Sequence, residues 1–213
     1  MKIDLHLHSE FSWDSSVSIS DYISKAEQMD FSAISITDHN NTDSHDVIRD
    51  LQSQTSVLLI PGQEVSTRDG HLLVYGWLPS IKSQLSMQET VQFAVEKGGY
   101  CIAAHPFDKF RSGKGTKIFE SNILGFEILN ASSWLGYPNW KAKKVFKSHP
   151  SYVGVANSDA HRLEEFGSAY TILDPDGNPT IESVFDGLSV ARIGGHRIGI
   201  VRKLYRFFLR TIS

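Results

Sequence analysis

The chain has 213 residues, of which 40% are hydrophobic and 21% charged; its formal net charge is −3, with nine histidines and one cysteine. This apolar content excludes intrinsic disorder, and the lone Cys101 excludes both an internal disulfide and a cysteine-based zinc site. The small net charge argues against a surface coated with nucleic acid but is compatible with a local basic groove. The many imidazoles favour a metal site with nitrogen and oxygen ligands.

Short apolar runs that predict buried strands recur along the chain. Most are continuous rather than alternating, which indicates that both faces of the sheet are covered. Seven strands are predicted, over Lys2 to His8, Ser32 to Thr37, Val57 to Ile60, Leu72 to Trp77, Tyr100 to Ala104, Gly125 to Leu129 and Tyr152 to Ala156.

Helical patterns lie between many of these runs. Ser18 to Met29 begins with Ser-x-x-Asp and Ser86 to Lys97 with Ser-x-x-Glu, both typical of helix N-termini. Asp43 to Ser53 and Pro138 to Lys147 are further predicted helices. The alternation of strands and helices predicts an α/β fold, and without a linker or an internal repeat we expect one domain over residues 1–213.

One connection departs from this alternation. Only Val65 to Gly70 separate Glu64 from His71, and a crossover connection needs at least about ten residues. Asp69-Gly70 is a turn signal, so the strand after it is predicted to run antiparallel to the strand before it.

No apolar run approaches the roughly 18 residues of a membrane-spanning helix, and the N-terminus lacks a basic leader followed by an apolar stretch. We therefore expect a soluble, cytoplasmic protein. The segment from about residue 192 to 213 is basic and amphipathic, with six Lys or Arg and no acid. Within it, the helical spacing of Ile200, Val201, Leu204, Phe207 and Phe208 predicts a terminal helix packed on the rest of the fold. Contact with a membrane surface or a nucleic-acid backbone is the less favoured alternative.

Imidazole and carboxylate groups gather at the ends of the predicted strands. His6 and His8 lie on one face of the first strand, about 6.6 Å apart along it, and can hold one cation. For this pair alone, two solvent-facing strand histidines are the less favoured alternative. Comparable groups stand at other strand ends: Asp38, His39, Glu64, His71, His105, Asp159 and His161. Asp38 is predicted either to orient His39 or to cap a helix. Because the carboxyl ends of barrel strands converge on one site, we predict a metal centre there.

These strand ends also carry a family resemblance. Its motifs are, in chain order, Asp4-Leu5-His6-Leu7-His8-Ser9, Thr37-Asp38-His39-Asn40, the pair Glu64 and His71, Ala104-His105-Pro106, and Ser158-Asp159-Ala160-His161. Together they resemble the PHP (polymerase and histidinol phosphatase) family from residue 4 to about 161. The resemblance implies an α/β fold in the form of a distorted seven-stranded (β/α)7 TIM-like barrel. It also implies two or three divalent metal ions as cofactors (Zn, Mn or Fe) and hydrolysis of a phosphate ester.

The resemblance further implies nine metal ligands. His6, His8 and Asp159 would bind one metal, Glu64 would bridge it to a second metal held by His71 and His105, and Asp14, His39 and His161 would hold a third. Asp14 stands in Phe11-Ser12-Trp13-Asp14-Ser15, where relatives more often have Ser-Asp-Gly, so this motif departs from the family pattern after the aspartate.

The implied chemistry is hydrolysis by a water shared between two cations. A bridging carboxylate holds the cations close enough to lower the pKa of that water, and the resulting hydroxide attacks phosphorus in line. The implied catalytic residues are Glu64, Asp159 and His161, and no protein nucleophile is needed. Ser9 and Ser158 are therefore interpreted as turn and supporting groups.

Candidate substrate contacts lie on the same rim. Arg111 and Lys114 belong to the glycine-containing loop after His105, which either cradles an anionic substrate or is an ordinary solvated loop. Arg162 is a similar candidate. Asn130 ends a predicted strand, at a position where relatives often place an Asn, and is a candidate for a supporting or substrate-binding role.

The leading hypothesis is a metal-dependent phosphoesterase that acts on a phosphorylated small molecule. The alternatives are a PHP-type nuclease acting on nucleotides or short oligonucleotide 5′ ends, and a non-catalytic metal-binding PHP module. The motifs hold metals rather than the leaving group, so they leave the substrate open. No long insertion interrupts the predicted barrel, which favours an open site, and no stable nucleic-acid complex is expected.

Overall fold

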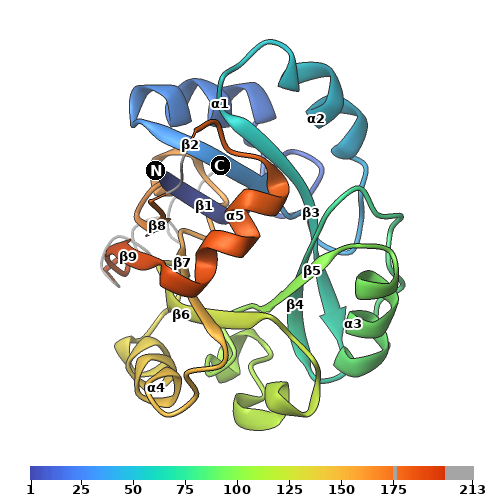
Figure 1. Cartoon of the computed structure of the whole chain (residues 1–213), viewed down its shortest axis with the longest axis vertical. Helices are drawn as coiled ribbons and strands as arrows, with labels where there is room; N and C mark the ends of the chain where they lie inside the picture. The colour runs from blue at the N-terminus through green and yellow to red at the C-terminus, as the bar shows by residue number, and fades with distance from the viewer. Residues whose placement is uncertain (175–176, 200–213) are drawn as a thin grey trace, which may run out of the picture.

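The computed structural model describes residues 1–174 and 177–199, so the predicted terminal helix from residue 200 onward lies outside the described residues. In the described part, the chain forms one mixed sheet curled into a barrel, with helices on its outer side (Figure 1). None of the helices in these two ranges is long and apolar enough to cross a membrane.

Nine strands form the sheet in the described ranges, so the prediction of seven is wrong in number. They are β1 (Lys2–Leu7), β2 (Phe31–Ile36), β3 (Leu58–Thr67), β4 (Gly70–Tyr75), β5 (Tyr100–Ala103), β6 (Gly125–Asn130), β7 (Val153–Asn157), β8 (Ala169–Ile172) and β9 (Arg192–Gly195). The α-helices are α1 (Ile19–Gln28), α2 (His45–Gln52), α3 (Met87–Glu96), α4 (Gly136–Phe146) and α5 (Ile181–Gly187). The two unpredicted strands, β8 (AYTI) and β9 (RIGG), are short and include threonine, arginine or glycine, so they do not stand out as apolar runs.

The sheet has the order β7-β6-β5-β4-β3-β2-β1-β8-β9. β4 is antiparallel to both β3 and β5, whereas β1, β2 and β3 run parallel, as do β5, β6 and β7. The predicted hairpin is confirmed, with Gly70 at its turn in a conformation of positive φ (119°) that favours glycine. Because this hairpin and the short link from β7 to β8 replace crossover helices, the α-helices of the described part do not complete a regular (β/α)7 repeat.

Contacts between the two ends of the sheet nearly close the barrel. The backbone N–H of His8, just after β1, donates to the carbonyl of Ala160, beyond β7, over 2.9 Å. In β8, the Thr171 hydroxyl accepts the N–H of Ala156 at 2.9 Å and donates to its carbonyl at 3.0 Å. The result is a barrel-like mixed α/β fold in which the carboxyl ends of β1 and β7 lie side by side.

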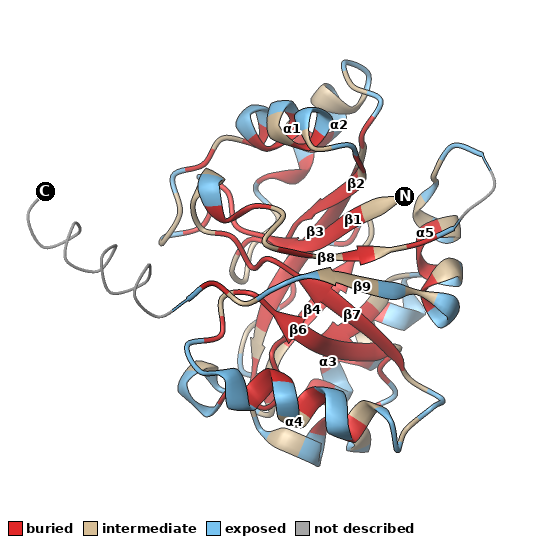
Figure 2. Cartoon of the chain, turned by 90° about the vertical axis from the view of Figure 1, so that its left-hand side faces the viewer, coloured by how far each residue is buried: buried red, intermediate tan, exposed pale blue. Residues whose placement is uncertain are grey.

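The apolar core fills the barrel and the space between the sheet and the helices, whose outer faces are exposed (Figure 2). On α5, Val184 and Phe185 pack in one cluster with Ile3 of β1 and Tyr75 of β4. Phe185 also stacks on Tyr100, the first residue of β5, with ring centroids 4.1 Å apart. Helix α5 therefore covers the amino ends of β1 and β5 and the carboxyl end of the antiparallel β4. The opposite end of the barrel is left to form a functional site.

Gly125 allows β6 to approach β7 closely. A Cβ atom at this position would lie 2.1 Å from the carbonyl oxygen of Val153, which belongs to the backbone and cannot rotate away. We expect Gly125→Ala to lower the free energy of unfolding by about 1–3 kcal/mol, the usual cost of overpacking, as measured by urea denaturation. Gly136→Ala is the control, because no described atom lies within 4 Å of a Cβ placed there. An equal loss in the two variants would contradict the prediction.

Candidate metal centre

Polar side chains from several strands converge at the carboxyl end of the barrel. They come from His6 in β1, His8 just after it, His39 after β2, Glu64 in β3, His71 in β4, His105 after β5, and Asp159 and His161 after β7. His71 lies near the start of β4. It reaches the same end because β4 is antiparallel to its neighbours, so its start lies beside their carboxyl ends.

Three groups of potential ligand atoms form at this end in the described residues, and within each group the atoms lie within 4.8 Å of one another. The groups are His8, Asp14, His39 and His161; His6, His8 and Glu64; and Glu64, His71 and His105. Glu64 belongs to two of them. A carboxylate shared in this way can bridge two cations.

Glu64 is fully buried among the imidazoles. Its Oε1 lies 2.9 Å from Nδ1 of His71 and 3.0 Å from Nε2 of His105. Its Oε2 lies 3.1 Å from Nδ1 of His39 and 3.3 Å from Nε2 of His6. The two oxygens therefore face different sets of imidazoles, as a bridging position requires.

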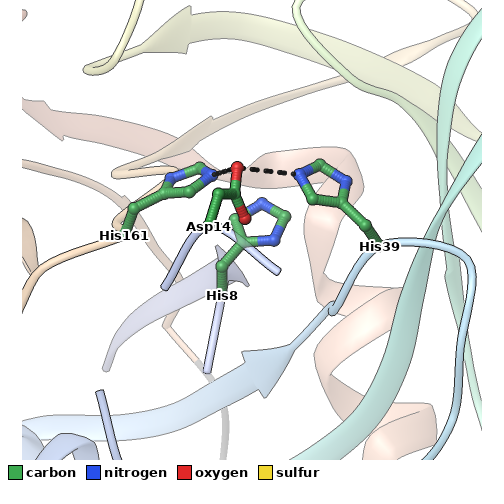
Figure 3. Close-up of side chains that lie close together, drawn as sticks. All are labelled: His8, Asp14, His39 and His161. Carbon is green, nitrogen blue, oxygen red and sulfur yellow. Dashed lines mark ion pairs between the residues drawn. The ribbon is translucent and has the colours of Figure 1, made fainter. Parts of the chain in front are cut away.

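Asp14 lies between His39 and His161 (Figure 3). Its Oδ2 is 3.0 Å from Nε2 of His161 and 3.5 Å from Nε2 of His39. The His8 ring lies close to both histidines, with centroid distances of 4.1 Å to His161 and 4.3 Å to His39. Although its sequence motif departs from the family pattern, Asp14 thus supplies a carboxylate to the group formed by these three imidazoles.

One carboxylate oxygen of Asp159 faces the imidazoles. The other contacts two of the candidate substrate-binding residues. Its Oδ1 lies 3.4 Å from Nε2 of His8 and 3.5 Å from Nε2 of His6. Its Oδ2 forms an ion pair with Arg111 and accepts a hydrogen bond from Nδ2 of Asn130 at 2.9 Å. Arg111 and Asn130 are therefore part of the centre.

The other two candidate substrate residues, Lys114 and Arg162, line separate pockets. Arg162 lies in a pocket of about 570 Å³ that also borders Asp14 and His161. Lys114 lies in a pocket of about 630 Å³ between the loop after β5 and helix α4. The four candidates thus divide between the centre itself and two flanking cavities.

The buried ligand atoms of the centre are suited to bind a divalent cation. Neither Oε2 of Glu64 nor Oδ1 of Asp159 accepts a hydrogen bond from the described residues, and both atoms are buried. The Nε2 atoms of His6 and His8 lie only 3.1 Å apart and within 3.5 Å of these oxygens. Unsatisfied buried acceptors are costly, and imidazole nitrogen with carboxylate oxygen is a ligand set that suits zinc, manganese and iron.

The carboxylates also decide the protonation of the imidazoles. Burial opposes protonation of His6, but the charges of Asp159 and Glu64 raise its pKa well above the ordinary value. Burial likewise opposes protonation of His39, yet the neighbouring carboxylates of Asp14 and Glu64 raise its pKa to about 10. Both rings therefore carry a proton near pH 7, held by the carboxylates around them.

Glu127 is a residue of the site that the sequence analysis missed. This buried carboxylate lies in β6, where Oε1 is 2.9 Å from Nδ1 of His6 and Oε2 accepts the backbone N–H of His105 at 2.7 Å. Asn157 donates to Oε1 at 2.9 Å. By engaging Nδ1, Glu127 turns Nε2 of His6 toward the other ligand atoms. The signal in the sequence is a carboxylate inside the otherwise apolar run Gly125 to Leu129.

Glu127→Gln is expected to weaken metal binding by about 10- to 100-fold, the usual effect of losing the partner that orients a metal-binding histidine. The amide keeps the size of the side chain but loses the charge that holds the His6 ring. Competition with a chelator measures the affinity, and Glu120→Gln at an exposed position is the matched control. Equal affinities of Glu127→Gln and the wild type would refute the role.

Asp38 has a different role from the two that were predicted. Its carboxylate accepts the N–H of Ser9 at 2.7 Å and the hydroxyl of Ser12 at 2.8 Å, and α2 begins further along the chain. The Ser12 hydroxyl in turn lies 3.3 Å from Nδ1 of His8. Asp38 therefore supports His8 through Ser12, instead of capping a helix or orienting the His39 ring.

Family models match two stretches of the chain. The model described as the PHP domain matches residues 4–106, and the model described as PHP-associated matches residues 136–193. MJ1587, an uncharacterized protein of Methanocaldococcus jannaschii, is 30% identical over 161 residues, which cover 70% of this chain and 94% of the relative.

Solved structures share the fold at low sequence identity. PsfC from Pseudomonas syringae PB-5123 has a TM-score of 0.73 at 13% identity, over 91% of each chain. A protein of Bifidobacterium adolescentis, provisionally named a metal-dependent phosphoesterase, has a TM-score of 0.66 at 15% identity, over 87% of this chain and 95% of that one. At these identities the likeness concerns the fold alone.

Proposed function

The chain belongs to the PHP family, and on this basis we propose that it is a metal-dependent phosphoesterase of a phosphorylated small molecule or nucleotide. The observation that carries the proposal is the shared carboxylate, because Glu64 belongs to two adjacent groups of ligand atoms. Paired divalent cations are typical of enzymes that hydrolyse or transfer phosphoryl groups. We propose that residues 1–213 act as a single PHP domain.

Nine residues are proposed to hold two or three divalent ions of Zn, Mn or Fe: His6, His8, Asp14, His39, Glu64, His71, His105, Asp159 and His161. When bound, such ions lower the pKa of a water and neutralise charge on phosphate oxygens. The contribution of the chain is to hold the ligands in position in advance, as Glu127 does for His6. Charges positioned in advance need little rearrangement during the reaction, which is why they stabilise its transition state efficiently. Glu64, Asp159 and His161 are the proposed catalytic residues among the nine.

Arg111 is proposed to bind the phosphate of the substrate. Its guanidinium pairs with Asp159 and lies 3.5 Å from Oδ1 of Asn130, while 17% of its side chain is exposed. A guanidinium carries five N–H donors in a planar fork that matches phosphate oxygens, more than these two acceptors use. Asp159 therefore links the proposed metal ligands to the proposed phosphate-binding residue.

Reconstitution with metal tests the proposal. Protein stripped by a chelator and loaded with Zn, Mn or Fe is assayed against para-nitrophenyl phosphate, bis(para-nitrophenyl) phosphate and a 5′-phosphorylated oligonucleotide. We expect at least one metal to restore hydrolysis of at least one ester, with two or three ions per chain by elemental analysis. Bound metal without hydrolysis of any ester would favour a non-catalytic module, and the absence of bound metal would overturn the proposal.

A further inference from the structure

A basic cavity lies beside the metal centre, between the loop after β5 and helix α4. Its volume is about 630 Å³, and the residues that line it include three lysines and no acid. We call it the lysine pocket, and its main side chains are those of Phe107, Lys109, Lys114, Tyr137 and Lys141. Only Lys114 among them was a candidate substrate contact on sequence grounds.

The two chain segments that form the lysine pocket are basic throughout. Residues 109–119 contain three lysines and Arg111 but no acid, and residues 128–158 contain four lysines and no acid. Asp108, which precedes the first segment, is buried and accepts the N–H of Phe110 within its own loop. This local excess of positive charge contrasts with the net charge of −3 of the whole chain, and it attracts a polyanion.

Exposed aromatic rings accompany these lysines. Tyr137 lines the pocket and is 61% exposed, and Trp140, one turn further along α4, is 56% exposed. The centroids of the two rings lie 5.6 Å apart. Phe110, in the loop that forms the other wall, is 81% exposed. Lysines beside exposed rings are typical of surfaces that bind single-stranded nucleic acid, because phosphates contact the lysines while bases stack on the rings.

Both walls of the lysine pocket are anchored to the metal centre. Arg111 lies between Lys109 and Lys114 in the sequence and pairs with Asp159. On the other side, Asn139 of α4 accepts the backbone N–H of Asn130, at the end of β6, over 3.0 Å. Both walls are thus joined to Arg111 and Asn130, which contact Asp159 of the proposed ligands.

The loop wall is also held in a defined shape. The N–H of Gly113 donates to the carbonyl of Asp108 at 2.9 Å, and the N–H of Gly115 donates to that of Pro106 at 2.8 Å. A Cβ atom on Gly113 would lie 2.6 Å from the Pro106 carbonyl oxygen, so only glycine fits this fold of the loop. The lysines of the loop thus project from a turn with a defined backbone conformation rather than from an extended linker.

We propose that the lysine pocket binds the nucleotide next to the scissile phosphate of a single-stranded oligonucleotide. Lys109, Lys114 and Lys141 contact its phosphates, and Tyr137 stacks on its base. A concave pocket admits a nucleotide, whereas a lipid surface would meet only projecting side chains. Cleavage at the neighbouring phosphate rests on the proposed function, but binding does not. The proposal departs from the expectation of no stable nucleic-acid complex, which rested on the charge of the whole chain.

Fluorescence anisotropy with a labelled, 5′-phosphorylated single-stranded 12-mer tests the proposal on full-length protein in excess chelator, so that hydrolysis plays no part. Tyr137→Ala is expected to weaken binding by roughly 5- to 150-fold, the usual value of one base stack, and Tyr137→Phe to restore it. Lys141→Gln is expected to reduce the slope of log K against log salt by about 0.7, the value for one phosphate contact on a single strand. Lys97→Gln, at an exposed position on the end of α3, is the matched control and should leave both quantities unchanged.

Three results would overturn the proposal: no binding of the 12-mer by the wild type, equal losses in Lys97→Gln and Lys141→Gln, or binding of anionic vesicles in place of the oligonucleotide. Because the assay contains no divalent metal, its failure is separate from a failure of the proposed function. Hydrolysis of para-nitrophenyl phosphate without binding of the 12-mer would reject the lysine pocket alone. Binding of the 12-mer without hydrolysis of any ester would reject the proposed phosphoesterase activity and support the proposed binding in the lysine pocket.

Discussion

Glu64→Gln is expected to lower hydrolysis at least about 10³-fold, because the metals supply several kcal/mol of transition-state stabilisation and each 1.36 kcal/mol is tenfold in rate. Glu64 is the carboxylate that two groups of ligand atoms share, so its loss affects both. An amide has no charge to offset two neighbouring cations, and its NH₂ group would face imidazoles that now contact carboxylate oxygens. The measurements are kcat on the best ester and metal content by elemental analysis.

Thermal unfolding distinguishes a loss of metal binding in Glu64→Gln from a general loss of stability. Metal that binds only the folded protein raises Tm in proportion to the logarithm of its concentration above Kd. We expect this rise in the wild type and in Glu120→Gln, an exposed control, but not in Glu64→Gln. Circular dichroism of the metal-free proteins should be the same for all three. Full metal content with unchanged kcat in Glu64→Gln would contradict the assignment of this residue.

Metal uptake is expected to release protons, with an affinity that rises about tenfold per pH unit for each proton displaced. Burial opposes protonation of His39, but the neighbouring carboxylates of Asp14 and Glu64 raise its pKa to about 10. Burial also opposes protonation of His161, but its hydrogen bond to Asp14 and the charge of Asp159 raise its pKa. With a pKa of about 10, the His39 ring is protonated at pH 7 and must lose that proton to coordinate a cation. Affinity therefore increases as pH rises toward these pKa values.

Isothermal titration calorimetry in two buffers of different ionisation enthalpy counts the released protons. His39→Ala is expected to release about one proton fewer than the wild type at pH 7. His105→Ala is the matched comparison, because burial lowers the pKa of His105 and this ring is already neutral. No dependence on the buffer, or the same loss of protons in both variants, would contradict the assignment of charge within the centre.

The hairpin of β3 and β4 was predictable because it depends on a few consecutive residues. The short connection and Asp69-Gly70 leave no room for a crossover helix, and Gly70 supplies the positive φ of the turn. The helix starts at Ser18 and Ser86 were predictable for the same reason, since each serine accepts the N–H of a residue three positions along. In contrast, β8 and β9 depend on pairing partners elsewhere in the chain, and their short sequences, AYTI and RIGG, do not form an apolar pattern that would show this.

The amino-acid sequence by itself determined the types of ligand and their order at the strand ends, because side-chain chemistry and spacing along a strand are local properties. Only the tertiary structure decided which of these side chains contact one another. Glu127 engages His6 from another strand, and Arg111 pairs with Asp159 instead of remaining a solvated loop cation. The lysine pocket likewise depends on the tertiary structure, because its walls come from segments that are separate in the sequence. Such contacts follow from the closure of the barrel, which brings these side chains within bonding distance, and no local pattern carries that information.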